Sequence, residues 1–135
     1  MTTPLWCLLL VAIAPYLIAG IGGYLRLRQL GELDNHDPRK QAERLEGAAA
    51  RAVAAQQNAW EALALFAPAV IVNHVLGGAP GASATAAGVF VAARVGHLVC
   101  YLADWATARS AVFLVGLASA LWLFGLAVRA PGVAE

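Results

Sequence analysis

Charged residues are scarce in this sequence. Only 13% of its 135 residues are charged, whereas soluble domains average about 25%. The net charge is +1 and no basic stretch is long enough to follow a phosphate backbone, so we expect no nucleic-acid partner. The two cysteines, Cys7 and Cys100, lie inside apolar runs without metal-ligand spacing. We therefore expect neither a bound metal nor a disulfide.

Apolar residues make up 61% of the chain. A chain of this length has room for one domain, whose small core could not bury so much apolar surface. Residues 2–25 carry no charge, and about 20 apolar residues cross the hydrocarbon core as a helix. A cleavable signal peptide is the other interpretation, but no basic region precedes the apolar run. The sequence thus predicts an integral membrane protein in contact with membrane lipid.

The remaining spans are separated by turn sequences. Residues 26–47 hold most of the charges and include "DNHDPR", where we expect Pro38 to stop any helix. The stretch "GGAPGAS" interrupts the next uncharged run, and "DWATAR" precedes the last one. The predicted fold class is an all-α membrane protein, a four-transmembrane-helix bundle forming a single domain over residues 1–135. The predicted helices cover about residues 3–28, 47–77, 83–105 and 109–129.

Basic residues are distributed unevenly between the two sides. Arg109 lies in the third connection and only Arg129 lies on the opposite side. The first connection contains Arg26, Arg28, Arg39, Lys40 and Arg44. The positive-inside rule places the charged loops in the cytoplasm and both termini outside. We expect a multi-pass protein of the inner or plasma membrane.

The second and third predicted helices each carry three polar residues at helical spacing. They are Arg51, Asn58 and Glu61 on the second helix and Arg94, His97 and Tyr101 on the third. Spacings of three, four and seven residues place each set on one helix face. One interpretation is structural, because interhelical polar pairs stabilise membrane bundles by about 0.6 kcal/mol each. The length of the polar line favours the other interpretation, a binding site.

Depth in the membrane suggests which of these residues meet. At 1.5 Å per residue, Arg94 lies about 15 Å from the cytoplasmic end of its helix, and Glu61 lies at a similar depth. Either charge alone would be costly in hydrocarbon, so we predict a direct Glu61–Arg94 ion pair. This pair would form the floor of a polar cleft, with His97 level with Asn58 and Tyr101 nearer the cytoplasmic mouth.

Three stretches of the chain resemble a known family. "DNHDPR", "RAVAAQQNAWEALALFAP" and "AARVGHLVCYLADWATARS" are similar to the MAPEG family, the membrane-associated proteins in eicosanoid and glutathione metabolism, and look like a bacterial-type member. The resemblance covers nearly the whole chain in order. It implies a homotrimer of four-helix protomers, with glutathione bound as co-substrate between neighbouring subunits near the cytoplasmic side.

The resemblance also implies roles for individual residues. Arg109 resembles the arginine beside the reacting thiol, and Ser110 is a second possible donor to sulfur. The positions that match glutathione-contacting residues are Arg51, Asn58, Glu61, Arg94, His97 and Tyr101. The chemistry agrees, because the two carboxylates of glutathione suit guanidinium groups and a nearby cation stabilises a thiolate.

Two positions depart from the family pattern. Many members have a second arginine where this chain has Ala54, and some catalytic members have a basic residue where it has Gln57. Both differences remove positive charge from the cleft. Two function classes therefore stay open. One is a glutathione transferase or peroxidase acting on lipophilic electrophiles or hydroperoxides. The other is a non-enzymatic membrane protein that binds a lipid or a thiol, or acts as a scaffold.

The asymmetry of basic residues makes the topology testable. A periplasmic or extracellular reporter enzyme fused after Glu135 should be active, because the rule places the C-terminus outside. A cytoplasmic reporter at the same point should be inactive. Activity of the cytoplasmic reporter would reverse the orientation and place the polar cleft on the other side of the membrane.

Overall fold

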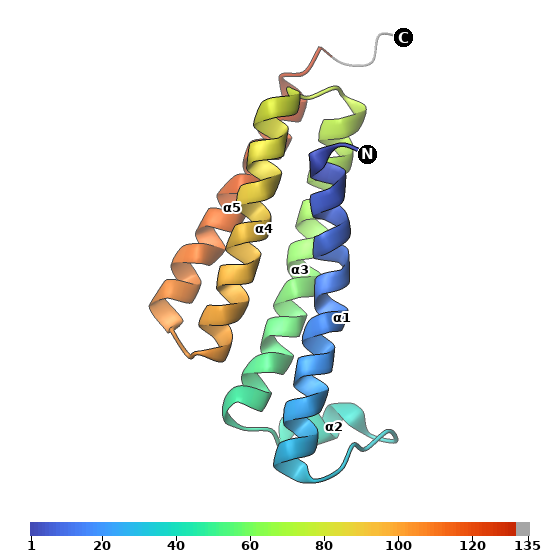
Figure 1. Ribbon diagram of the computed structural model, residues 1–135, viewed down its shortest axis with the longest axis vertical. Helices are drawn as coiled ribbons and strands as arrows, with labels where there is room; N and C mark the ends of the chain where they lie inside the picture. The colour runs from blue at the N-terminus through green and yellow to red at the C-terminus, as the bar shows by residue number, and fades with distance from the viewer. Residues whose placement is uncertain (132–135) are drawn as a thin grey trace.

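The computed structural model describes residues 1–131, which form five helices. They are α1 (Thr3–Leu30), α2 (Pro38–Glu43), α3 (Gly47–Val75), α4 (Pro80–Leu102) and α5 (Ala106–Val128). Within these residues there is no strand, and the predicted all-α fold is confirmed. The four long helices lie side by side, and α1 begins at the end of the bundle where α5 finishes (Figure 1). The last four residues of the predicted domain lie outside the described range.

Three helices, α1, α4 and α5, are long and apolar enough to cross a membrane. Large apolar side chains such as Leu10, Leu17, Leu114 and Leu121 are exposed on them, as expected where lipid is the solvent. The 29-residue α3 is not among these candidates, and it carries the predicted polar residues. The protein is therefore a membrane helical bundle, and its fourth span remains a prediction.

Prolines begin two helices. The expectation that Pro38 stops any helix was wrong, because this proline occupies the first turn of α2. Likewise α4 begins at Pro80, three residues before the predicted start. A proline at the first helical position lacks only an N–H that would have no intrahelical partner. At its other end α4 finishes at Leu102, before the predicted residue 105, because Asp104 adopts a left-handed backbone with φ of 62°.

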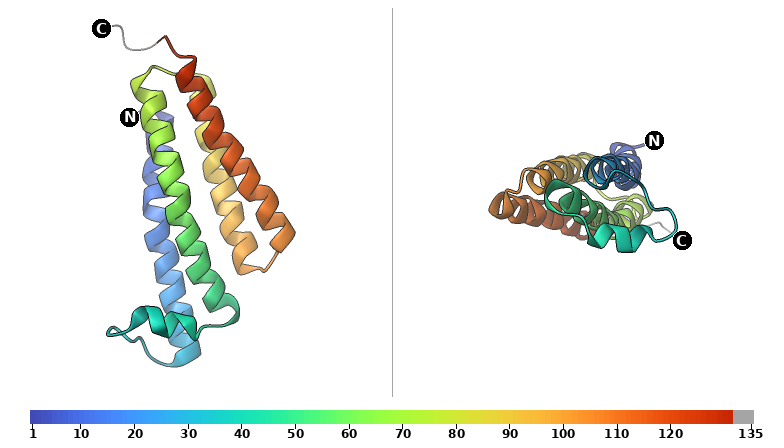
Figure 2. Two further views of the ribbon diagram at one scale, coloured as in Figure 1. Left: turned by 180° about the vertical axis from the view of Figure 1, so that it is seen from behind. Right: turned by 90° about the horizontal axis from the view of Figure 1, so that it is seen from below.

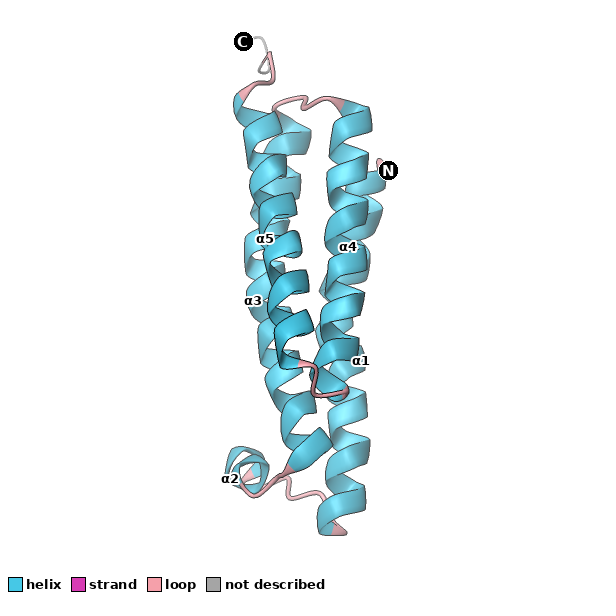
Figure 3. Ribbon diagram, turned by 90° about the vertical axis from the view of Figure 1, so that its left-hand side faces the viewer, coloured by secondary structure: helices cyan, strands magenta, loops and turns pink. Residues whose placement is uncertain are grey.

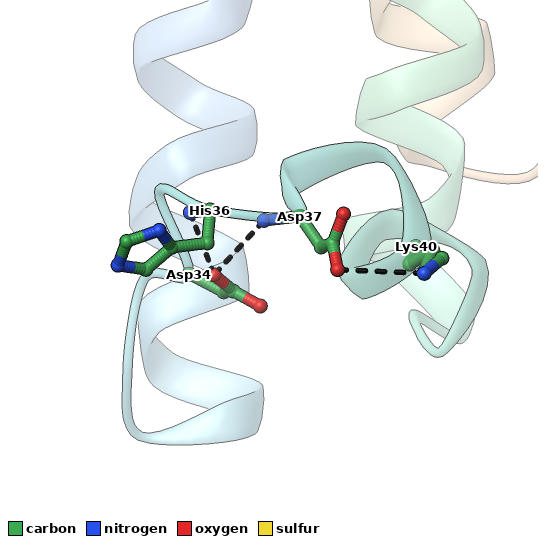
Figure 4. A network of polar contacts seen from close by, with 4 residues as sticks. All are labelled: Asp34, His36, Asp37 and Lys40. Carbon is green, nitrogen blue, oxygen red and sulfur yellow. Dashed lines mark hydrogen bonds and ion pairs between the residues drawn. The ribbon is translucent and has the colours of Figure 1, made fainter.

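The connection between α1 and α3 is organised by its own side chains (Figure 4). The Asp34 carboxylate accepts the backbone N–H groups of His36 at 2.8 Å and Asp37 at 3.1 Å. Asp37 also pairs with Lys40 at 3.4 Å. The buried Gln41 accepts the N–H of Asp34 at 3.1 Å. These local bonds hold α2 against the loop that precedes it.

The tightest packing lies in the half of the bundle nearer the termini. There the rings of Phe66 on α3 and Phe90 on α4 stack with centroids 4.0 Å apart, and both are fully buried. Small side chains such as Ala69 and Ala86 surround them and let the helices approach closely. Toward the other end of the bundle, where α2 and the α4–α5 turn lie, the α4–α5 pair diverges from the α1–α3 pair (Figure 2). The packed half therefore serves as the scaffold, and the cavities begin where this packing ends, since Phe90 also lines one of them.

Asn73 joins three helices at the packed end. Its side chain is 2% exposed, donates to the carbonyl of Leu123 on α5 at 3.1 Å and accepts from Ser83 on α4 at 2.7 Å. The loop from α3 to α4 joins the two helices at this end of the bundle (Figure 3). A Cβ at Gly78 in this loop would overlap the Asn73 amide. Asn73 therefore depends on a glycine five residues later in the chain.

This packing predicts that Gly78→Ala destabilises the bundle. The added methyl group must displace the Asn73 amide and break its two buried hydrogen bonds, which costs about 1–3 kcal/mol per stranded group. Gly81→Ala is the matched control, because a Cβ there meets nothing within 4 Å. Thermal unfolding in detergent compares the two variants. Equal melting temperatures would show that Asn73 does not hold the helices together.

Candidate functional site

Asn58 on α3 lies between the two charges predicted to pair directly. Arg94 of α4 donates to the Asn58 Oδ1 at 2.6 Å, and the Asn58 Nδ2 donates to Glu61 at 3.1 Å. The predicted Glu61–Arg94 ion pair is therefore wrong. Among residues 1–131 the ion pairs within 4.0 Å are Lys40–Asp37 and Arg51–Asp104. An amide offers an acceptor to the guanidinium and a donor to the carboxylate, so it satisfies both charges without their meeting.

His97, Tyr101 and Arg109 continue the line from the bundle interior toward the α4–α5 turn. His97 is 3% exposed, and its Nδ1 lies 3.3 Å from the Arg94 guanidinium. Because arginine can only donate, Nδ1 accepts this bond, and a neutral ring then carries its proton on Nε2. Tyr101 packs edge-on against His97 with centroids 5.2 Å apart. The Arg109 guanidinium lies 4.5 Å from the centre of the Tyr101 ring.

Seven of the eight predicted site residues line two adjoining cavities. The larger, here named the polar cavity, has a volume of about 330 Å³. It is lined by Asn58, His97, Tyr101, Arg109, Ser110, Phe113 and Leu114. The smaller cavity, about 130 Å³, contains Glu61 and Arg94 and shares Asn58 and Phe113 with the first. The fold thus brings together residues that lie up to 52 positions apart in the chain.

Arg51 is the exception, since it lines neither cavity. Its guanidinium reaches from α3 to the α4–α5 turn, where it lies 3.4 Å from Asp104 and donates to the carbonyl of Leu102 at 3.3 Å. Sequence reasoning did not single out Asp104. The only sequence signal was an acidic residue in the short turn between two apolar runs.

Ser110 lines the polar cavity, but its hydroxyl proton is already used. It donates to the carbonyl of Ala106, one turn earlier in α5, at 3.2 Å. In this arrangement the Ser110 oxygen faces a ligand as an acceptor. Donation to sulfur, the predicted role, requires a different side-chain rotamer.

A family model for the MAPEG family matches residues 3–129, nearly the whole chain. The chain belongs to the MAPEG family. This confirms the resemblance and places the protein among membrane proteins related to glutathione or eicosanoid metabolism. No curated protein matched the chain.

A third cavity of this MAPEG protein is apolar and lies between α1, α3 and α4. Its volume is about 380 Å³, within the range of small-molecule sites. Side chains such as Val11, Ile18 and Leu98 form most of its wall, and Arg94 and His97 are its polar lining. His97 lines this apolar cavity and the polar cavity alike. The Arg94–His97 layer therefore separates an apolar chamber from a polar one.

The bridging position of Asn58 predicts how this MAPEG protein responds to substitution. Asn58→Leu should lower stability by about 1–3 kcal/mol or more, because it strands the Arg94 and Glu61 groups that the amide satisfied. Glu61→Gln should have a smaller effect, since the new amide oxygen can still accept from Asn58. Gln57→Leu, at the exposed neighbouring position, is the control. Thermal unfolding in one detergent ranks the variants, and a Glu61→Gln loss as large as that of Asn58→Leu would contradict the bridge.

Proposed function

We propose that the protein is a membrane-embedded, glutathione-dependent transferase or peroxidase that acts on lipophilic electrophiles or hydroperoxides. The observation that carries this proposal is the position of Arg109. Its guanidinium packs on Tyr101 within the polar cavity and is accompanied there by Ser110, His97 and Asn58. Arginine stays protonated in proteins, so the cavity holds a permanent positive charge beside an apolar chamber.

A permanent cation in such a cavity suits thiol chemistry. A free cysteine thiol has a pKa of about 8.5, and a neighbouring positive charge favours the thiolate, which is the nucleophile. In conjugation the thiolate sulfur forms a bond to an electrophilic carbon, and the leaving group departs with the electron pair. In peroxide reduction the sulfur attacks one peroxide oxygen, the O–O bond breaks and the alkoxide takes a proton. A second glutathione then attacks the resulting sulfenic acid to give the disulfide and water.

The remaining polar groups match the other charges of glutathione. Arg94 can pair with a carboxylate through N–H groups that Asn58 does not use. The exposed Glu61 carboxylate, held by Asn58, can accept the glutathione ammonium group. The two cavities thus offer positive and negative groups in adjoining positions. Glutathione carries both signs of charge, so this arrangement supports it as the co-substrate.

The apolar cavity supports a lipophilic second substrate. Exposed apolar residues such as Leu10 and Leu17 of α1 form part of its lining. A non-enzymatic function, the binding of a lipid without turnover, is the second candidate. The size and apolar lining of the same cavity favour it.

The polar face of α3 supports a homotrimer with a cytoplasmic site. Gln57 and Glu61 are exposed on the protomer, and a carboxylate turned toward lipid would be costly. Neighbouring subunits that cover this face would remove that cost. The basic first connection supports charged loops in the cytoplasm, both termini outside, and residence in an inner or plasma membrane.

The proposal predicts a specific effect for Arg109→Ala. Turnover of a generic electrophile should fall by roughly 10²–10³-fold, as when a donor to a developing anion is removed elsewhere. Glutathione affinity should change little, because Arg109 acts mainly on the chemical step. Arg109→Lys should recover part of the rate, since lysine keeps the positive charge but lacks the planar guanidinium with its paired N–H donors.

Arg129→Ala is the control, because Arg129 follows α5 at the opposite end of the bundle. Turnover assays with electrophiles and hydroperoxides give kcat, and calorimetry gives the affinity for glutathione. If the wild-type protein binds no thiol and turns over none of these substrates, the proposed enzymatic function is excluded. The lipid-binding function would then take its place.

A further inference from the structure

Asp104 occupies a position at the end of α4 that favours glycine. Its φ of 62° lies in the left-handed region, where a Cβ is unfavourable. The backbone N–H of Asp104 donates to the carbonyl of Tyr101 at 3.3 Å, and that of Trp105 donates to Cys100 at 2.9 Å. These two bonds form a Schellman turn, whose left-handed residue is usually glycine. The backbone bonds alone close the turn, so they do not explain why an aspartate stands there.

Among residues 1–131 the side chain of Asp104 has one partner, Arg51, and the contact between them is weak. The closest approach of guanidinium and carboxylate is 3.4 Å, and the second Arg51 bond, to the Leu102 carbonyl, is 3.3 Å. Charge-assisted bonds are usually about 2.7–2.9 Å long. The Arg51 Nε is buried and has no acceptor among the described residues. Arg51 is therefore held in place with its hydrogen-bonding capacity only partly used.

A ligand in the polar cavity can reach Arg51. Arg51 and Asn58 lie seven residues apart on α3, about 10 Å along the helix axis. An extended tripeptide spans about 10–11 Å, so a tripeptide thiol contacting Asn58 can bring a carboxylate to Arg51. The Asp104 side chain is 66% exposed, and a displaced carboxylate would move directly into water.

We propose that Asp104 is an internal competitor for Arg51. Its carboxylate occupies the guanidinium in the free protein, and a carboxylate of the incoming thiol ligand displaces it. Asp104 thereby lowers the affinity for glutathione and selects ligands whose carboxylate pairs with Arg51 better than its own does. This inference rests on the proposed function and makes Asp104 a residue that determines specificity.

Affinities of Asp104 variants test the competition. Calorimetry compares wild-type protein with Asp104→Asn and Asp104→Gly, which remove the carboxylate and, for glycine, also suit the left-handed backbone. Both should bind glutathione roughly two- to five-fold more tightly, the range expected when an exposed ion pair no longer competes. Glutathione diethyl ester, whose carboxylates are blocked, should bind all three proteins equally. Asp37→Asn, which removes a negative charge from the other loop, should leave glutathione affinity unchanged.

Weaker glutathione binding by the Asp104 variants would overturn the inference, because it would mean that Asp104 positions the turn for the ligand. An equal gain for the ester would also overturn it. If neither wild-type nor variants bind glutathione, the proposed function fails, and a measurement without ligand decides the state of Arg51. Phenylglyoxal should then modify Arg51 faster in Asp104→Asn than in the wild type, as read by mass spectrometry, with Arg109 unchanged. An unchanged Arg51 rate would show that Asp104 does not occupy it.

Discussion

The bridge that Asn58 makes between Arg94 and Glu61 is the interaction on which the site depends. In hydrocarbon an arginine needs a polar partner close by, because no water is available to solvate it. A direct ion pair would satisfy both charges by neutralising each against the other. Through the amide, each charge is stabilised and still has groups free to bind. The site can therefore remain polar and accessible within a membrane bundle.

The two halves of the bundle divide stability from function. Near the termini, the stacked Phe66 and Phe90 and the hydrogen bonds of Asn73 hold α3, α4 and α5 together. Toward the end with the α4–α5 turn, the α1–α3 and α4–α5 pairs diverge, and the cavities are lined by residues of both pairs. These contacts fix the relative positions of the helices that carry the polar groups of the site. Rigid placement of this kind is what a binding or catalytic site requires.

The site places a polar chamber and an apolar chamber on either side of one layer of residues. His97 lines both chambers, and Arg94 lies beside it in the same layer. Under the proposed function, a charged thiol on one side and an apolar molecule on the other would meet at this layer without either entering an unsuitable environment. The α4–α5 turn lies beside the same region, because it leads to Arg109 and presents the carboxylate that contacts Arg51.

The sequence by itself determined the membrane setting, the positions of the long helices and the shared faces of their polar residues. These are local properties, because hydropathy over about twenty residues predicts a span and spacings of three and four define a helix face. Only the tertiary structure decided which polar groups meet. Arg94 contacts Asn58 in place of Glu61 because the reach of side chains between helices selects the partner. Arg51 lines neither cavity and contacts the Asp104 carboxylate of the α4–α5 turn, and no local pattern in the sequence specifies the left-handed backbone of Asp104.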